Sequence, residues 1–215
     1  MKTVFVSGAE GFAGSHLIQY LRQRGYDVVC GVRNRSRKLT LERNAFKALV
    51  CDVGDAINVA RTIASVKPDC VVHLAGTSRA GDAAEEPLTA YQSIVTAWAN
   101  VLDAVRRTVP RARVLLASAA DVYGNAGGGG QALTESTATQ PVSTFGALKA
   151  AAETIATTFF NSYHLNTTIV RPFPYIGGNQ PESFFFGSVA TKLANWDATK
   201  NGGELKLPEI GRAHV

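Results

Sequence analysis

Hydrophobic residues are spaced along this chain in two alternating ways. Short apolar runs rich in Val, Ile and Cys show no polar alternation, which predicts strands buried on both faces. Between them, apolar residues recur at the three- and four-residue spacing of an amphipathic helix. The expected strands are residues 4–6, 27–32, 45–50, 70–74, 114–117 and 167–170. The expected helices are residues 12–24, 56–66, 87–109, 145–163 and 183–195.

Regular alternation of strands and helices is typical of a parallel sheet covered by helices. The pattern therefore predicts an α/β fold, a doubly wound parallel sheet of Rossmann type with helices on both faces. Two segments depart from the alternation. Residues 124–130 include four consecutive glycines and should form a loop. The chain after Arg171 is irregular, with several prolines and glycines before the last expected helix.

Composition limits what the chain can be. Its 215 residues are 46% hydrophobic and 18% charged, which suits one sizeable core and argues against disorder. The net charge is +5, and much of the excess lies in the stretch Arg33-Asn34-Arg35-Ser36-Arg37-Lys38. A local basic cluster suits a phosphate-bearing small molecule as well as nucleic acid. Because no nucleic-acid-binding motif accompanies it, we expect the small molecule and no nucleic acid.

Cysteine and histidine usage bears on metals and on the compartment. Cys30, Cys51 and Cys70 lie in apolar segments outside any CxxC pair, which indicates buried free thiols in a reducing compartment. The four histidines are scattered, so we expect no metal site. No apolar run is long enough to span a bilayer, and the early first strand leaves no room for a signal peptide. We therefore expect a cytoplasmic protein that does not associate with a membrane.

A glycine-rich turn follows the first expected strand and opens the first helix. Its residues are Gly8-Ala9-Glu10-Gly11-Phe12-Ala13-Gly14. In dinucleotide-binding turns the first glycine permits the bend, the second lets the backbone approach a pyrophosphate, and the third allows close packing of helix on strand. The helix start adds free N–H groups and a positive dipole end. We therefore expect a dinucleotide cofactor to bind at Gly8, Gly11, Phe12, Ala13 and Gly14.

The end of the second strand bears on the choice of cofactor. NAD binding usually uses a carboxylate there to hold the ribose hydroxyls, whereas this chain has Val32-Arg33-Asn34-Arg35. Arg33 or Arg35 can pair with a 2′-phosphate through a bidentate guanidinium, which favours NADP(H), with NAD(H) as the alternative. After the third strand, Asp52 and Val53 are expected near the adenine edge, although an aspartate there is also common turn chemistry.

Further segments occur in the order and at the spacing of one known family. They are Ser7 to Gly14, Cys51-Asp52, Val72-His73-Leu74-Ala75-Gly76, Ala120-Asp121-Val122-Tyr123-Gly124, Pro141-Val142-Ser143, Lys149-Ala150-Ala151-Ala152-Glu153 and Arg171-Pro172-Phe173. With these segments the chain resembles the extended short-chain dehydrogenase/reductase family, the nucleotide-sugar epimerases, dehydratases and reductases. The arginines after the second strand and the Pro-Val-Ser segment look most like the branch that handles GDP-sugars.

The resemblance implies a cofactor-binding domain followed by a substrate-binding region. Residues 1–171 would be an NADP(H)-binding Rossmann domain, with Leu74, Ala75 and Gly76 beneath the cofactor and Lys149 on the nicotinamide ribose. Residues 172–215 would be a partial substrate-binding region, small or truncated because family members continue past this length. The resemblance also implies a nucleotide-sugar substrate and a homodimer formed through helices 87–109 and 145–163.

Two positions depart from the catalytic pattern of that family. Ala119 stands where members have Ser or Thr, and Phe145 stands where they have the tyrosine. Hydride transfer at an alcohol carbon needs a proton shuttle at the oxygen, so we do not expect ordinary alcohol oxidation from this constellation. The candidate catalytic residues that remain are Lys149, Asp121 and Tyr175. Asp121 matches the position of a carboxylate in the sugar dehydratases. The alternative interpretation is equally weighted: an aspartate that caps the end of the fifth strand.

Three hypotheses stay open at this point. The first, favoured by the weight of the family, is an NAD(P)-dependent nucleotide-sugar epimerase/dehydratase-like enzyme with an atypical active site. The second is a catalytically inactive NADP(H)-binding protein that senses the cofactor or assists a catalytic relative. The third is an engineered inactive variant, because Ala119 and Phe145 are substitutions suited to trapping a substrate. Ile94 and Pro174, where members often have asparagine, favour natural divergence.

Overall fold

The computed structural model describes residues 2–128, 130 and 132–196. The chain divides into two compact units, Met1–Phe173 and Pro174–Val215. The polar segment with Gly202 and Gly203 lies outside the described residues.

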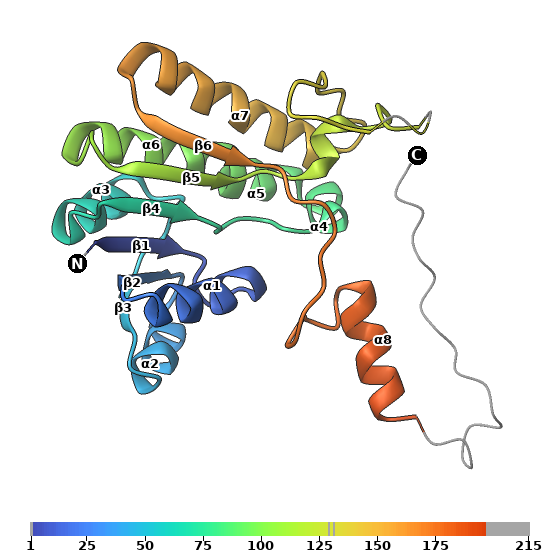
Figure 1. Cartoon of the computed structure of the whole chain (residues 1–215), viewed down its shortest axis with the longest axis horizontal. Coiled ribbons are helices and arrows are strands. Elements are labelled where there is room, and N and C mark those ends of the chain that lie inside the picture. Colours follow the sequence, from blue (N-terminus) through green and yellow to red (C-terminus); the bar gives the residue numbers. More distant parts are fainter. Residues whose placement is uncertain (1, 129, 131, 197–215) are drawn as a thin grey trace. The chain divides into compact units, whose positions relative to one another are not determined.

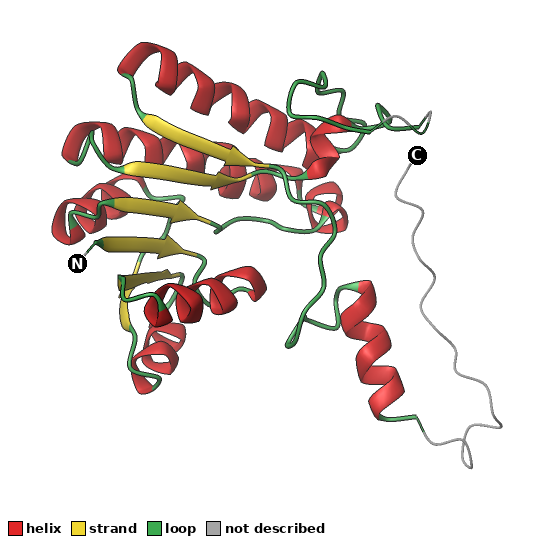
Figure 2. Cartoon of the chain, in the orientation of Figure 1, coloured by secondary structure: helices red, strands yellow, loops and turns green. Residues whose placement is uncertain are grey.

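A six-stranded parallel sheet forms the centre of the first unit (Figures 1 and 2). Its strands are β1 (Thr3–Ser7), β2 (Asp27–Val32), β3 (Lys47–Val50), β4 (Cys70–His73), β5 (Arg113–Ala117) and β6 (Asn166–Val170). Their order in space is β3-β2-β1-β4-β5-β6, and every neighbouring pair is parallel. The strand order reverses at β1, so the carboxyl ends of β1 and β4 flank the crevice where sheets of this kind bind ligands. The predicted doubly wound Rossmann-type fold is confirmed.

Helices of the first unit cover both faces of the sheet (Figure 2). They are α1 (Phe12–Gln23), α2 (Arg35–Arg43), α3 (Ala56–Val66), α4 (Ala80–Glu85), α5 (Pro87–Tyr91), α6 (Ala97–Thr108) and α7 (Thr144–Tyr163). On one face α3, α6 and α7 share a core with strand residues such as Val71. On the other face α1 and α2 pack with Val4, Val6 and Val72. Consecutive residues of a strand thus enter different cores, which explains the absence of polar alternation in the sequence.

Two helices of the first unit were not among the expected ones. Helix α2 buries only Leu41, so the stretch carries no apolar stripe. Its start is instead fixed by Asn34, whose Oδ1 accepts a hydrogen bond of 3.0 Å from the Arg37 amide. Helix α4 is one short segment that buries only Ala83. Hydrophobic periodicity misses helices of this kind because their burial is too small to leave a pattern.

The helix predicted over 87–109 is present as α5 and α6, which follow each other without a break in the helical backbone. A single π-helical turn, Gln92–Thr96, separates α5 from α6. The loop after β4 packs against this turn: a Cβ on Gly76 would lie 2.7 Å from the Ser93 carbonyl oxygen, and Ser93 Oγ lies 2.8 Å from Thr77 Oγ1. Such a turn is a local change of hydrogen-bond pattern inside an α-helix, which hydrophobic spacing does not identify.

The second unit contains α8 (Phe185–Ala194), close to the expected helix at 183–195. Ahead of it, the Gln180 side-chain amide donates a 3.2 Å hydrogen bond to the Tyr175 carbonyl. A Cβ on Gly187 would collide with the backbone carbonyls of Gln180 and Pro181, so a glycine lets this turn pack on the helix. Across both units, none of the helices described by the structure has the length and apolar content of a bilayer span.

A partly buried ion pair between Arg171 and Glu153 connects the end of β6 to α7. Arg171 follows β6 directly, and its guanidinium donates hydrogen bonds of 3.0 Å and 2.6 Å to the two carboxylate oxygens of Glu153 on α7. The same guanidinium donates a 3.0 Å bond to the Tyr123 hydroxyl and lies over its ring. Tyr123 in turn donates to the Thr134 carbonyl. This network connects the last strand and the longest helix to the loop at 124–140.

We predict that Arg171→Met destabilises the protein by about 3–5 kcal/mol, because it leaves the buried Glu153 carboxylate without its partner. Arg107→Met is the matched control, since Arg107 pairs with Asp103 on an exposed surface and should contribute less than about 1 kcal/mol. Urea unfolding monitored by circular dichroism measures both. Equal midpoints for the two variants would contradict the structural role assigned to Arg171.

Candidate functional site

The glycine-rich turn packs against the chain that leaves β4. Gly8 has a φ of +72°, and a Cβ there would lie 2.7 Å from the Ala75 backbone nitrogen. A Cβ on Gly14 would overlap the backbone of Gly8 and Ala9. The Gly11 amide donates a 3.0 Å hydrogen bond to the Gly8 carbonyl and closes the turn. Only glycine at the first and third positions lets the helix start come this close to the sheet edge.

The first turn of α1 therefore opens at the carboxyl edge of the sheet. Gly11 is the N-cap residue, and as a glycine it has no side chain to cap this helix. Phe12 begins the helix, followed by Ala13 and Gly14, and the first turn carries no acidic residue. The amides at the start of a helix, together with its positive dipole end, favour an anion. This arrangement fits the pyrophosphate of a dinucleotide.

At the end of β2 the structure places Arg33 and Arg35 on the surface. Arg33 follows the strand and Arg35 is the first residue of α2, and both side chains are exposed. The Arg33 amide lies 3.5 Å from Oε1 of Glu10, which belongs to the glycine turn. The Glu10 carboxylate therefore lies at the backbone of the strand end that also carries Arg33 and Arg35.

Asp52 and Val53 follow β3 and shape a turn. Asp52 Oδ1 accepts a 2.9 Å hydrogen bond from the Gly54 amide, and its own amide donates to Asn58 Oδ1. The Val53 carbonyl accepts from the Asn100 side chain at 3.0 Å, which links this turn to α6. These contacts of Asp52 stabilise the turn, which is the alternative role expected for an aspartate after a strand. Because its side chain is exposed, Asp52 is also accessible to an adenine.

The loop that leaves β4 is anchored to β1. The Leu74 amide donates a 3.1 Å hydrogen bond to the Ser7 carbonyl, and Ala75 meets Gly8 as described above. Beneath them, His73 Nδ1 lies 2.7 Å from Ser7 Oγ. Burial, with a smaller contribution from the charge of Lys149, lowers the pKa of His73 to about 3, so the imidazole is neutral at physiological pH. The predicted segment from Leu74 to Gly76 thus forms a rigid floor beside the glycine turn.

Lys149 projects from α7 into an apolar pocket at the end of β5. Its Nζ donates a 2.7 Å hydrogen bond to the Ala117 carbonyl and lies 5.6 Å from the ring centre of Phe145 and 5.7 Å from that of Trp98. The residue is only 7% exposed. Burial lowers the pKa of Lys149 to about 8, against the opposing charges of Glu153 and Asp121. A substantial share of this amine is therefore neutral near pH 8.

The two substituted positions lie in the same core as the elements around Lys149. Ala119 and Phe145 are buried members of the cluster formed by α3, α6 and α7. Asp121 sits in the 3₁₀ turn Ala120–Tyr123 and is exposed, and its charge acts on Lys149. Tyr175 belongs to the second unit, where its side chain is 51% exposed. The charge of Asp121 thus acts on Lys149, and the buried side chains of Ala119 and Phe145 carry no hydroxyl.

Three buried polar atoms have no hydrogen-bond partner in the described chain: Glu10 Oε2, His73 Nε2 and Ser118 Oγ. All three residues lie at or just beyond carboxyl ends of strands, where sequence reasoning had placed the site. Nothing in the linear pattern pointed to them individually, because a partnerless atom is a matter of packing. Among the described residues, no three His, Cys, Asp or Glu side chains gather in a way that could hold a metal ion.

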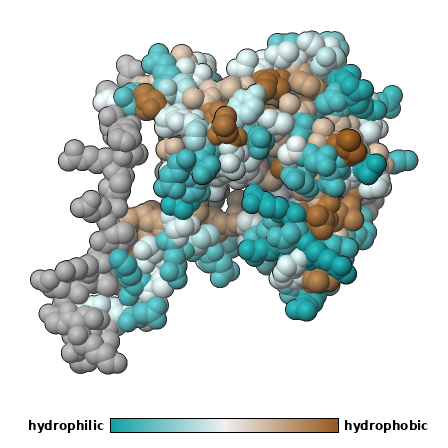
Figure 3. All heavy atoms as spheres, turned by 180° about the vertical axis from the view of Figure 1, so that it is seen from behind, coloured by the Kyte–Doolittle hydropathy of each residue, from teal (hydrophilic) through white to brown (hydrophobic). Residues whose placement is uncertain are grey.

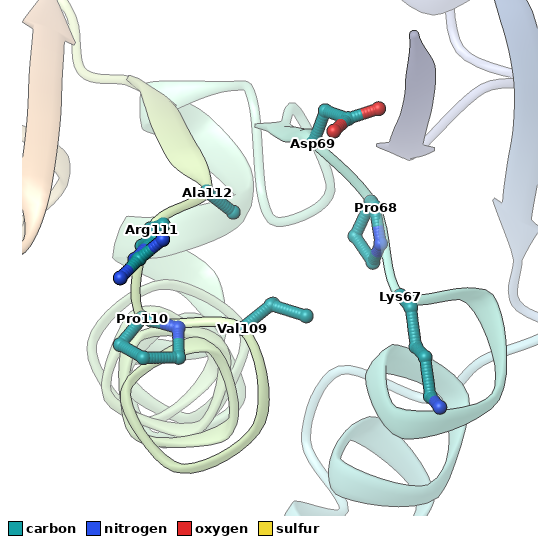
Figure 4. A pocket seen from close by; sticks show the side chains of 7 residues that line it. All are labelled: Lys67, Pro68, Asp69, Val109, Pro110, Arg111 and Ala112. Carbon is teal, nitrogen blue, oxygen red and sulfur yellow. The ribbon is translucent and has the colours of Figure 1, made fainter.

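A surface depression of about 360 Å³ lies away from this site. Figure 4 shows its lining from two segments, Lys67-Pro68-Asp69 and Val109-Pro110-Arg111-Ala112. These segments lead into β4 and β5, so the depression is at the amino edge of the sheet. Ligands of open α/β sheets bind at the opposite, carboxyl edge, and we assign the depression no role.

Comparison with known proteins points to one family. The family model described as GDP-mannose 4,6 dehydratase matches residues 5–211. Among related sequences, UDP-glucuronate 4-epimerase 3 of Arabidopsis thaliana is 31% identical over 86% of this chain and 45% of its own length. GDP-6-deoxy-D-mannose reductase of Pseudomonas aeruginosa is 26% identical over 96% of this chain and 63% of its own length. The chain thus spans about half the length of the first of these relatives.

Solved structures agree with the sequence matches. The UDP-glucose 4-epimerase of Thermus thermophilus, solved in complex with NAD, superimposes with a TM-score of 0.78 at 26% identity. That similarity covers 88% of this chain and 60% of the epimerase chain.

We predict that Gly14→Ala lowers the free energy of unfolding by about 1–3 kcal/mol, because its Cβ overlaps the backbone of the glycine turn. Gly81→Ala is the control: Gly81 also lies in a helix, but nothing surrounds the position of its Cβ. There the gain in helix propensity should leave stability unchanged or slightly higher. Urea titration of both variants checks the prediction, and a Gly14→Ala protein as stable as the parent would refute the close packing.

Proposed function

Because the chain belongs to the extended short-chain dehydrogenase/reductase family of nucleotide-sugar epimerases and dehydratases, we propose that it binds a nicotinamide dinucleotide and acts on a nucleotide sugar. The observation that carries the proposal is the start of α1 at Gly11 and Phe12, packed through Gly8 and Gly14 against the edge of the sheet. Residues 1–171 would hold the cofactor, and residues 172–215 would contribute to the substrate site. Arg33 and Arg35 support a preference for NADP(H), through pairing with the 2′-phosphate.

Lys149 is the group that we propose for proton transfer. The cofactor would accept or return a hydride at a sugar carbon, while the hydroxyl on that carbon must lose or regain a proton. The hydroxyls that the resemblance leads one to expect for this task are replaced by Ala119 and Phe145. The neutral amine of Lys149 can accept the proton, and the charge of exposed Asp121 stabilises the resulting ammonium. Tyr175 stays a further candidate for a substrate contact.

A second candidate function is cofactor binding without turnover. It is favoured by the burial of Ala119 and Phe145, which fill the proton-shuttle positions with carbon. The two candidates differ in what the double variant Ala119→Thr/Phe145→Tyr should do. If the parent chain converts a nucleotide sugar, the site is a rebuilt natural one. If only the double variant does so, the parent is a binding protein.

For the substrate we propose a GDP-sugar. The family model carries that name, and the resemblance of Pro141-Val142-Ser143 points the same way. Relatives named for UDP-sugars also match, so a panel of GDP-, UDP- and dTDP-sugars, separated by ion-exchange chromatography after incubation, decides the nucleotide.

We predict that turnover rises about tenfold per pH unit up to a pKa near 8 and then levels off, since Lys149 accepts a proton only when neutral. Lys149→Met should lower kcat by about 10²–10⁴-fold. Lys47→Met is the control, because Lys47 is an exposed lysine of β3 that pairs with Asp27 at the start of β2. A profile that is flat from pH 6.5 to pH 9 in the parent would rule out Lys149 as the proton acceptor.

We further propose that α6 and α7 form a homodimer interface. Phe160 and Tyr163 on α7 are 53% and 49% exposed, and the Arg106 guanidinium lies 4.6 Å from the ring centre of Tyr163. Hydrophobic residues also appear elsewhere on the surface, as the patches in Figure 3 show, so exposure alone does not identify the interface.

We predict that the parent chain sediments as a dimer and that Phe160→Glu converts it to a monomer, because the charge would be buried in the interface. Ile57→Glu on α3, another exposed apolar position, should leave the dimer intact. Analytical ultracentrifugation distinguishes these results. A monomeric parent, or a dimer that Phe160→Glu does not affect, would overturn the assignment.

A further inference from the structure

Glu10 reaches from the glycine turn to the end of the second strand. It lies between Gly8 and Gly11 in the chain, after β1. Its Oε1 faces the amide of Arg33, the first residue beyond β2, at 3.5 Å. Its Oε2 is buried and has no hydrogen-bond partner among the described residues. The carboxylate therefore bridges two neighbouring strand ends with one oxygen weakly held and the other unsatisfied.

The negative charge of Glu10 affects the pKa of a neighbouring thiol and lies near positively charged side chains. Cys30, inside β2, has its pKa raised to about 12, chiefly by burial and secondarily by the negative charge of Glu10, against the opposing charge of Arg22. The charge of Glu10 thus acts on β2, and its carboxylate contacts the end of that strand at Arg33. The side chains of Arg33 and Arg35 point to the surface at the same strand end, so positive and negative groups share one small region.

A partnerless buried carboxylate oxygen is costly for the free protein. A buried acceptor without a donor loses its hydration and gains nothing in return. The terminal torsion of a glutamate side chain is broad and roughly two-fold, so a half-turn of the carboxylate exchanges its two oxygens. A ligand with two adjacent hydroxyl donors would satisfy both oxygens at once.

The adenosine ribose of a dinucleotide carries such a pair of hydroxyls. In Rossmann folds an acid at the end of the second strand usually receives them, and this chain has Arg33-Asn34-Arg35 at that point. The structure supplies a carboxylate at the same place from a different segment. A 2′-phosphate there would instead face a like charge at short range, which is unfavourable.

We propose that Glu10 accepts the ribose hydroxyls of the bound dinucleotide and opposes a 2′-phosphate, so that it offsets the attraction of Arg33 and Arg35 for NADP(H). The inference rests on the proposed function, because it requires that a dinucleotide bind at the glycine turn. Selectivity between the two cofactors is then a balance of opposing charges at one strand end, and Glu10 limits how far that balance favours NADP(H).

The test is isothermal titration of NAD⁺ and NADP⁺ into the parent chain and into Glu10→Gln. The variant keeps the shape of the side chain and removes its charge. We expect weaker NAD⁺ binding and tighter NADP⁺ binding, so that the ratio of the two dissociation constants shifts toward NADP⁺ by at least about tenfold. Glu42→Gln is the matched control, since Glu42 is an exposed glutamate of α2 that pairs with Lys38. It makes the same change in net charge and should leave the ratio unchanged.

Thermal unfolding tests the role of Glu10 independently of the titrations. Thermal unfolding should show free Glu10→Gln as stable as the parent or more so, because an unsatisfied buried charge has been removed. NAD⁺ should stabilise the variant less than the parent, and Glu10→Asp, which retains the charge, should keep the parent's order of preference.

The outcomes distinguish a failure of the proposed function from a failure of this inference. If the parent binds neither dinucleotide, both the proposed function and this inference are wrong. If the parent binds and Glu10→Gln leaves the ratio unchanged, or weakens both ligands equally, only the role of Glu10 is overturned. A ratio that shifts equally in Glu42→Gln would also overturn it, because long-range charge would then explain the effect.

Discussion

The contact between two pieces of backbone, the glycine turn after β1 and the chain leaving β4, determines the rest of this site. Gly8 lies so close to Ala75 that a methyl group would not fit, and Gly14 lies closer still to the turn itself. This approach positions the start of α1 at the carboxyl edge, beside the floor formed by Leu74, Ala75 and Gly76. Glu10 of the turn and the arginines after β2 then lie at one end of this edge, and Lys149 of α7 lies at the end of β5.

The chemistry of the site follows from what surrounds Lys149. Its amine hydrogen-bonds one carbonyl and otherwise faces aromatic rings, so burial makes the charged form less favourable. A tyrosine at position 145 would have provided a hydroxyl that shares the proton; phenylalanine provides only a ring face. In our account this substitution makes lysine the proton-transfer group, where the family resemblance assigns it the nicotinamide ribose.

Much of the fold could be predicted from the sequence, because buried parallel strands have a distinct apolar signature. All six strands and the helices with broad apolar faces were expected, since their burial shows in the hydrophobic pattern. Helix α2 was not, because its start depends on a side-chain cap at Asn34 and its surface is almost wholly polar. The π-helical turn at Gln92–Thr96, which lies against Gly76, was not predicted either, because hydrophobic spacing does not identify the hydrogen-bond pattern inside a helix. At the site, the spacing of the glycines was enough to predict the turn. The contact between Glu10 and the Arg33 amide was not predicted, because it exists only when β1 and β2 lie side by side in the sheet.

The central claim is that a dinucleotide binds at the start of α1, and nuclear magnetic resonance of the ¹⁵N-labelled chain tests it most directly. During titration with NAD⁺ or NADP⁺, the amide signals of Phe12, Ala13 and Gly14 should move in a saturable way, together with those of Ala75 and Arg33. Signals of the amino-edge segment around Lys67 should stay in place. Saturable shifts confined to other parts of the chain, or none with either dinucleotide at millimolar concentration, would contradict the account.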